Sequence, residues 1–370
     1  MSSGTYRRVE ARAGAGRDGL VVVRRPTNEP GPGECLIRVE VATINRADLH
    51  RIDGSYGGVA ITPFQTLGDS SRGADESVAV YVPGMEAAGT VIAVGKSVET
   101  SLVGTRVLVH SHSWCGQCDE CRAGLDNACP HGRVFGSQTP GVGAWSEQVV
   151  VPAKQVHVLP DQLPLEHAVC AEVTYGPVWW GLRHRTAVGP HDLVAVQGGD
   201  STLGLAAVQV IKLVGATPVM IVRDRRSPRA RQLADLEGVH VRERAEVTSA
   251  AFVAEFGRRP LVVLDLLGAA SFHQSLELVA SGGTVLAIGA HTGASVDLRI
   301  DRLFQRNVAI QGIARAPIAG MVEILDLMAA GRLTPRIARE FSLDDVRSAV
   351  EFADSRAQFG KTLLRPQKVV

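Results

Sequence analysis

The chain has 370 residues, of which 45% are hydrophobic and 21% charged, and its formal net charge at neutral pH is +1. This length exceeds one typical hydrophobic core, so two domains are expected. The charge gives no reason to expect nucleic acid or an anionic membrane as a partner, and no apolar run approaches membrane-spanning length.

The first part of the chain predicts a mostly β domain over residues 1–163. Its N-terminus lacks the apolar core of a signal peptide, so a cytoplasmic location is expected. Residues 20–41 predict two strands joined by a Pro/Gly turn. A loop and short helix follow, and the polar middle of 57–82 predicts an exposed insertion that either rims a substrate pocket or is inert. A cysteine-rich lobe occupies 111–131.

From residue 164 the pattern changes to alternating helices and strands. Residues 164–313 predict an α/β domain with a doubly wound parallel sheet of the Rossmann type. The tail, 314–370, contains further helices and strands and is expected to return to the first domain.

The segment 193–224 predicts one strand–helix–strand unit with a Gly-rich turn after its first strand. Such a turn offers backbone N–H groups and a helix N-terminus to a pyrophosphate. It fits G-x-G-x-x-G imperfectly, because Ser201 stands at the middle glycine, and a tight structural turn is the alternative interpretation. The candidate cofactor-binding residues of this turn are Gly198, Gly199, Asp200, Ser201, Thr202, Leu203 and Gly204.

The residues after the second strand of this unit favour NADPH over NADH. An NAD site usually has an acidic side chain there for the ribose hydroxyl, whereas this chain has Arg223, Arg225 and Arg226 around Asp224. Guanidinium groups suit a 2′-phosphate. A solvated helix start is the alternative, and Asp224 is a competing acceptor for the hydroxyl.

Gly289 and Ala290 follow a later strand of the same predicted sheet. Ligands of open α/β sheets lie outside the carboxyl ends of the strands, so these residues are candidates to approach the nicotinamide. A simple turn is the other interpretation.

Cys115, Cys118, Cys121 and Cys129 follow the pattern C-x2-C-x2-C-x7-C. Four thiolates in one lobe predict a closed, structural Zn²⁺ site, with metal-free cysteines as the alternative. Cys35 and Cys170 lie in apolar contexts and are expected to be buried thiols.

The whole chain resembles the medium-chain dehydrogenase/reductase superfamily, in which zinc-type alcohol dehydrogenases and quinone reductases are grouped. The resemblance is carried, in the family order, by PGPGECLIRVEVATIN, PGMEAAGTVIAVG, the cysteine lobe, the Gly-rich unit and FGKTLLRP. It implies a GroES-like first domain, a Rossmann domain, a structural zinc and a homodimer.

The positions that would hold a catalytic zinc depart from that pattern. Asn45 stands at the first-loop cysteine, Met85 at the histidine of GHE, and Ala47 at the proton-relay hydroxyl. The third ligand position falls near Ala171 or Glu172, with Cys170 out of register. Methionine is a poor ligand for this cation, so a structural zinc without a catalytic zinc is predicted.

NRADLHRIDGSYG, QGGDSTLG and VRDRRS resemble the zinc-free branches, quinone oxidoreductases and 2-enoyl thioester reductases. The resemblance implies that Tyr56 is the proton donor or electrophile and Asn45 a positioning residue, whereas a packing role at a loop end is the other interpretation of Tyr56. The predicted function is NADPH-dependent hydride transfer to an activated C=C bond of an enone, quinone or enoyl thioester. The alternatives are a zinc-type alcohol or polyol dehydrogenase with atypical ligands and a non-catalytic NADPH-binding sensor or scaffold.

Overall fold

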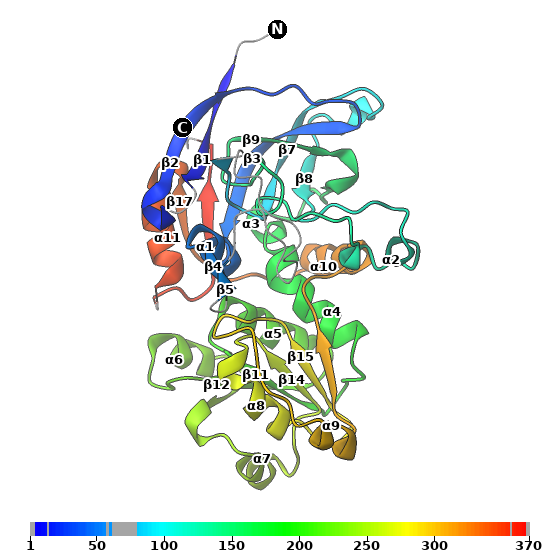
Figure 1. The fold of residues 1–370 in the computed structure, drawn as a ribbon, viewed down its shortest axis with the longest axis vertical. Coiled ribbons are helices and arrows are strands. Elements are labelled where there is room, and N and C mark those ends of the chain that lie inside the picture. The colour runs from blue at the N-terminus through cyan, green and yellow to red at the C-terminus, as the bar shows by residue number, and fades with distance from the viewer. Residues whose placement is uncertain (1–3, 13–14, 57–58, 61–79, 356, 368–370) are drawn as a thin grey trace. The chain divides into compact units, whose positions relative to one another are not determined.

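The computed structural model describes residues 4–12, 15–56, 59–60, 80–355 and 357–367 (Figure 1). Most of the predicted insertion at 57–82 therefore lies outside the described residues. The chain divides into two compact units, which are described separately. Unit 1 comprises Met1–Ser55, Ala60–Val173 and Pro317–Val370, and unit 2 comprises Tyr56–Val59 and Thr174–Ala316.

Unit 1 is built on a seven-stranded sheet, with strand order β10-β8-β7-β3-β18-β17 and with β9 also paired to β3. Its strands are β3 (Glu34–Ile44), β7 (Ala87–Val94), β8 (Arg106–Val109), β9 (Gln148–Pro152), β10 (Val156–Val158), β17 (Ile337–Ser342) and β18 (Lys361–Arg365). A second sheet has the order β2-β1-β6, formed by β1 (Thr5–Arg12), β2 (Leu20–Pro26) and β6 (Val80–Tyr81). Apolar side chains of both sheets and of α11 form one core.

The helices of unit 1 are short and lie between or beside these strands. They are α1 (Arg46–Ile52), α2 (Asp119–Arg122), α3 (Leu165–Ala168), α10 (Ile318–Ala329) and α11 (Val346–Asp354). Helix α3 packs against β3 and β7. In the division into compact units, this helix and the residues up to Val173 belong to unit 1.

The C-terminal strand β18 pairs antiparallel with β3, with Thr362 opposite Ile44. The strand therefore carries Lys361 to the end of β3, from which α1 continues. This register positions a lysine near the end of the chain beside residues 43–45.

Unit 2 contains a six-stranded, wholly parallel sheet with the order β13-β12-β11-β14-β15-β16. Its strands are β11 (Leu193–Gln197), β12 (Thr217–Val222), β13 (His240–Glu243), β14 (Val262–Asp265), β15 (Thr284–Ala287) and β16 (Ala309–Gly312). Its helices are α4 (Gly176–His184), α5 (Thr202–Leu213), α6 (Pro228–Ala234), α7 (Ser249–Phe256), α8 (Ala269–Leu278) and α9 (Ile300–Arg306) (Figure 1). The strand order reverses direction between β11 and β14, where such sheets bind ligands. The predicted α/β fold class, with its doubly wound sheet, is confirmed.

Two short strands, β4 (Ser55–Tyr56) and β5 (Val59–Ala60), pair with each other. Among the described residues, no helix combines the length and apolarity that a bilayer crossing requires.

Candidate functional site

The Gly-rich turn connects β11 to α5 and lies close against β12. A Cβ at Gly199 would approach the Cβ of Met220 to 2.7 Å, and one at Gly204 would lie 2.1 Å from the carbonyl oxygen of Gly199. Gly198 has a φ of +78°, a conformation that side chains disfavour. The glycines therefore allow a tight approach of strand, turn and helix, as a dinucleotide turn requires.

The polar side chains of this turn have structural partners. The Ser201 hydroxyl accepts the Gly204 N–H at 3.1 Å and caps α5, while its own proton remains available to donate. Asp200 pairs with Arg229 at 3.3 Å. Thr202 and Leu203 form the first turn of α5. The candidate phosphate contacts in this turn are thus backbone N–H groups at the helix N-terminus and the Ser201 hydroxyl.

The arginines after β12 differ in their partners. Arg225 lies 3.7 Å from Glu246, and Arg226 lies 3.3 Å from Asp224. Asp224 also accepts the Arg226 N–H at 2.9 Å, and this hydrogen bond lowers the pKa of Asp224. Arg223 is exposed and forms no salt bridge among the described residues, although its charge also lowers the pKa of Asp224. Arg223 therefore stays the leading candidate among the predicted arginines for a phosphate contact.

Gly289 and Ala290 follow β15 in a closely packed segment. A Cβ at Gly268 would lie 2.8 Å from the Cα of Ala290, and one at Gly289 would lie 2.3 Å from the Leu266 carbonyl oxygen. The next residue, His291, has its ring centroid 5.6 Å from that of Tyr56. The structure therefore brings Tyr56 next to the predicted nicotinamide segment. His291 is a candidate site residue that the sequence reasoning missed.

Asn45 belongs to a buried polar network with Thr43, Glu86 and Lys361. One Glu86 oxygen, Oε2, accepts from the Thr43 hydroxyl at 2.5 Å and from Asn45 Nδ2 at 3.1 Å, and it lies 2.9 Å from Lys361 Nζ. Its other oxygen accepts the Val173 N–H at 2.8 Å. Lys361 Nζ also donates to Asn45 Oδ1 at 2.5 Å. We call Thr43, Asn45, Glu86 and Lys361 the ammonium network.

The ammonium network includes Asn45, which stands at a position where the zinc-type pattern has a ligand of the catalytic zinc. Its only cation is the Lys361 ammonium, and Glu86 is saturated by donors. Asn45 and Met85 supply no strong ligand, and a second cation beside the ammonium would be repelled. These residues do not fit a catalytic zinc. Burial raises the pKa of the Cys170 thiol, on which the charges of Lys361 and Glu86 also act.

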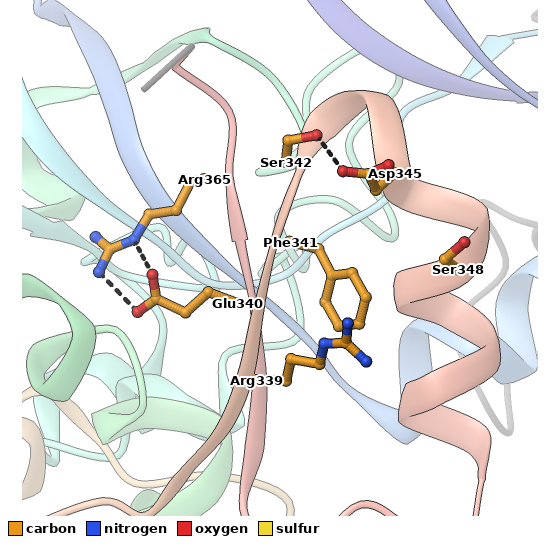
Figure 2. Close-up of a pocket in the computed structure, with 7 residues that line it drawn as sticks. All are labelled: Arg339, Glu340, Phe341, Ser342, Asp345, Ser348 and Arg365. Carbon is orange, nitrogen blue, oxygen red and sulfur yellow. Dashed lines mark hydrogen bonds and ion pairs between the residues drawn. The ribbon is translucent and has the colours of Figure 1, made fainter. Parts of the chain in front are cut away.

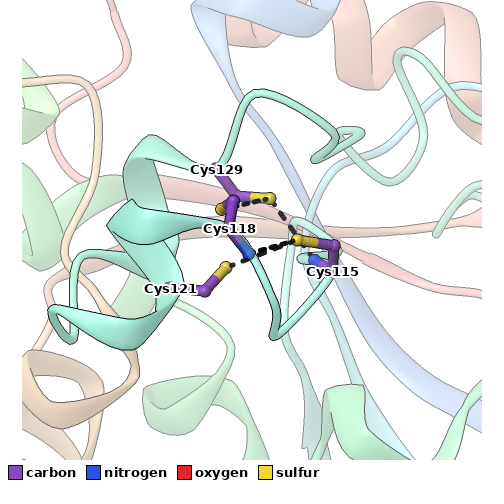
Figure 3. Close-up of side chains that lie close together, drawn as sticks. All are labelled: Cys115, Cys118, Cys121 and Cys129. Carbon is purple, nitrogen blue, oxygen red and sulfur yellow. Dashed lines mark hydrogen bonds between the residues drawn. The ribbon is translucent and has the colours of Figure 1, made fainter.

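The four cysteines of the lobe converge (Figure 3). Cys115 Sγ lies 3.9 Å from Cys121 Sγ, and Cys118 Sγ lies 3.8 Å from Cys129 Sγ. Tetrahedral zinc with sulfur at about 2.3 Å requires an S···S separation of about 3.8 Å. Backbone N–H groups of Gln117 and Cys118 donate to Cys115 Sγ and lower its pKa to about 6. The lobe fits one closed structural Zn²⁺.

A further buried cluster lies beside this lobe, and sequence reasoning missed it. His110 and His112 follow β8, and Glu172 belongs to a π-helical turn at Ala171–Tyr175. Their side chains are 0%, 1% and 1% exposed. Burial lowers the pKa of His110 to about 4. Burial raises the pKa of Glu172, but the two imidazoles and the Ser111 N–H outweigh it and hold this pKa at about 2. In the sequence, the signal for this cluster is the pair of histidines on either side of Ser111.

A surface cavity of ≈ 430 Å³ lies over β17, β18 and the start of α11 (Figure 2). Arg365 pairs there with Glu340 at 2.9 Å, and Ser342 donates to Asp345 at 2.7 Å. Arg339 lies 4.8 Å from the centre of the Phe341 ring. None of the predicted site residues lines it.

Comparison with known proteins matches two family models, the alcohol dehydrogenase GroES-like domain at residues 31–161 and zinc-binding dehydrogenase at 240–364. An acryloyl-coenzyme A reductase from Sulfurisphaera tokodaii is 24% identical, over 95% of this chain and 97% of the relative. An L-threonine 3-dehydrogenase from Pyrococcus abyssi is 30% identical, over 75% of each chain. The solved structure of a thermostable alcohol dehydrogenase from Pyrobaculum aerophilum superposes with a TM-score of 0.81 at 27% identity, covering 98% of this chain and 100% of the other. The chain thus belongs to the medium-chain dehydrogenase/reductase superfamily of oxidoreductases.

Proposed function

We propose that the protein is an NADPH-dependent reductase that transfers hydride to a C=C bond conjugated to a carbonyl, with enoyl thioesters as the first substrate class, and that it uses no catalytic zinc. The observation that carries this proposal is the ammonium network. Alcohol oxidation of the zinc type relies on a Lewis acid at this place, whereas the cation of the ammonium network is the Lys361 side chain, paired with Glu86. Conjugated acceptors need hydrogen-bond donors or a proton source instead.

The cofactor proposal rests on unit 2. The glycine turn lets the backbone N–H groups of the start of α5 approach a pyrophosphate, and the Ser201 proton adds a donor. Arg223, unpaired among the described residues, is assigned to the 2′-phosphate, where a guanidinium forms charge-assisted hydrogen bonds. Arg225 and Arg226 lie beside it, already paired to carboxylates. NADPH supplies the hydride when bound.

Tyr56 is assigned to the reacting end of the substrate. Its ring lies against His291, immediately after Gly289 and Ala290. Hydride addition at the β-carbon moves the C=C electron pair to the α-carbon and the carbonyl oxygen. The tyrosine hydroxyl then donates a hydrogen bond to that oxygen or a proton to the α-carbon. Asn45 acts as a positioning residue, because both ends of its amide are occupied by the ammonium network.

The acryloyl-coenzyme A reductase supports the enoyl thioester class, because the similarity extends over nearly the full length of both chains. An L-threonine 3-dehydrogenase from Xanthomonas campestris is 26% identical over 94% of this chain and 96% of the relative, so the extent of similarity does not separate the two activities. Its name describes a dehydrogenase of an alcohol, which makes alcohol oxidation the rival to be tested. Homodimerisation stays a prediction.

The test is a steady-state assay of NADPH consumption with an enoyl-coenzyme A, a cyclic enone and a quinone, each repeated with NADH. A parallel arm supplies NADP⁺ or NAD⁺ with L-threonine, a secondary alcohol and a polyol. We expect turnover of the enoyl thioester with NADPH and none of the alcohols. Alcohol oxidation would overturn the proposal, and NADPH binding without turnover on any acceptor would favour a sensor.

A further inference from the structure

The cluster of His110, His112 and Glu172 has the geometry of a metal site separate from the cysteine lobe. One ligand atom from each residue lies within 4.8 Å of the other two. Glu172 Oε1 is 3.0 Å from His110 Nδ1 and 3.8 Å from His112 Nδ1. With zinc–nitrogen and zinc–oxygen bonds of about 2.0–2.1 Å, tetrahedral zinc separates its ligands by about 3.4 Å. The two measured separations bracket that value.

The chain positions these three side chains without rearrangement. His110 and His112 are separated by one residue after β8, and their ring centroids lie 4.4 Å apart. His112 forms a β-bridge with Val134, which holds that backbone in place. Glu172 is fixed by the Ser111 N–H, which donates to its Oε2 at 2.5 Å and leaves Oε1 facing the imidazoles.

The three side chains of the cluster are buried, and a buried polar atom without a partner is costly. His110 Nε2 is buried and has no hydrogen-bond partner among the described residues. His157 Nε2 lies 3.3 Å from His110 Nδ1 and adds another imidazole rather than a cation. A divalent metal ion bound by the imidazole nitrogens and the Glu172 carboxylate would supply the partner that these ligand atoms lack.

The surroundings also match what metal-bound histidines require. Asp126 lies 3.7 Å from His112 Nε2, on the opposite ring nitrogen from Glu172. A carboxylate behind a ligating histidine orients the ring and strengthens it as a ligand. Asp126 is itself held by the Ile318 N–H at 3.2 Å.

We propose that His110, His112 and Glu172 bind a second divalent metal ion, with Zn²⁺ as the preferred species, at a site distinct from the cysteine lobe. Two imidazoles and one carboxylate form a common three-ligand zinc set that leaves one coordination position for water or another group. Imidazole ligation favours zinc over Mg²⁺ or Ca²⁺, which prefer oxygen ligands. Glu172 lies near the third ligand position of the zinc-type pattern, but His110 and His112 stand at neither of the other two, so the proposed site differs from the catalytic zinc site of that pattern.

The first test is the zinc content of the purified full-length protein, measured by plasma mass spectrometry. We expect about two zinc ions per chain. The double variant His110→Ala/His112→Ala should retain one, and Cys118→Ser/Cys121→Ser should retain the other. His273→Ala, which removes an exposed histidine, is the matched control and should retain both. One zinc in the wild type, lost entirely in the cysteine variant, would overturn the proposal.

A second measurement keeps the test decisive if the histidine variants fail to fold. Anomalous scattering from wild-type crystals at the zinc edge should give one peak among the four cysteines and another between His110, His112 and Glu172. A map with the cysteine peak alone refutes the second site. A peak at the ammonium network instead would contradict the zinc-free reductase proposal, so the two failures are distinguishable.

Discussion

Replacing Lys361 with methionine tests the ammonium network directly. Lys361 and Glu86 have side chains 3% and 0% exposed, and their charged atoms are 2.9 Å apart. Methionine keeps an apolar stem of similar reach but removes the cation, so the Glu86 carboxylate would remain buried with neutral donors. Removing one partner of a buried ion pair costs about 3–5 kcal/mol. We expect the free energy of unfolding of unit 1 to fall by about that amount.

The assay is urea unfolding followed by tryptophan fluorescence. Trp145 is fully buried, and its indole N–H donates to the Thr43 carbonyl oxygen at 2.9 Å, so its emission reports on the network. Because the chain has two units, their transitions are fitted separately. Arg38→Met is the control, since it removes a half-exposed partner of Glu40 and should cost no more than about 1 kcal/mol.

A double-mutant cycle then isolates the pair. Glu86→Gln alone leaves the ammonium without its anion, whereas Glu86→Gln/Lys361→Met removes both charges. We expect the double variant to be less destabilised than the sum of the single variants by about 1–3 kcal/mol. Additivity within about 0.5 kcal/mol, or a Lys361→Met effect no larger than that of Arg38→Met, would refute the reasoning.

Three further changes test the site and the pH response. Tyr56→Phe should lower kcat for enoyl thioester reduction by about tenfold or more with unchanged NADPH affinity, because the lost hydroxyl acts in the transition state; unchanged kcat removes Tyr56 from the mechanism. Arg223→Asp should shift the ratio of kcat/KM values toward NADH by at least about tenfold, and an unaltered ratio contradicts its 2′-phosphate assignment. Burial raises the pKa of Asp48 to about 7. Folding therefore takes up a proton between about pH 4 and pH 7, and stability should fall as pH rises through that window. Asp48→Asn should flatten this dependence, and denaturant midpoints that show the same slope in both proteins would contradict it.

The parts of the structure that sequence reasoning anticipated are those encoded locally. Strand β11, the glycine turn and α5 are consecutive, and their apolar runs and glycines indicate a parallel strand followed by a helix. The four cysteines likewise lie within fifteen residues of one another in the sequence, and the structure gathers them at zinc-like separations. In both cases the residues that meet in space are neighbours in the chain.

The polar clusters of unit 1 could not be found in that way. Lys361 is separated from Asn45 by 316 positions, and it reaches the network only because β18 pairs with β3. Glu172 is separated from Ser111 by 61 positions and meets the histidines because a π-helical turn presents it to the end of β8. Hydrophobic periodicity predicts which strands form, but it carries little information about which of them pair.

Glu86 shows how a contact between distant strands changes the inference drawn from a motif. In the sequence, Gly-Met-Glu indicates only that a histidine ligand is missing, and it leaves open whether other residues hold the metal. The structure shows that this carboxylate pairs with the Lys361 ammonium and accepts hydrogen bonds from Thr43 and Asn45. A metal ion at Glu86 would have to compete with this buried lysine, which argues against a catalytic zinc there in addition to the missing ligands. This competition supports the proposal that the substrate is polarised without a metal ion.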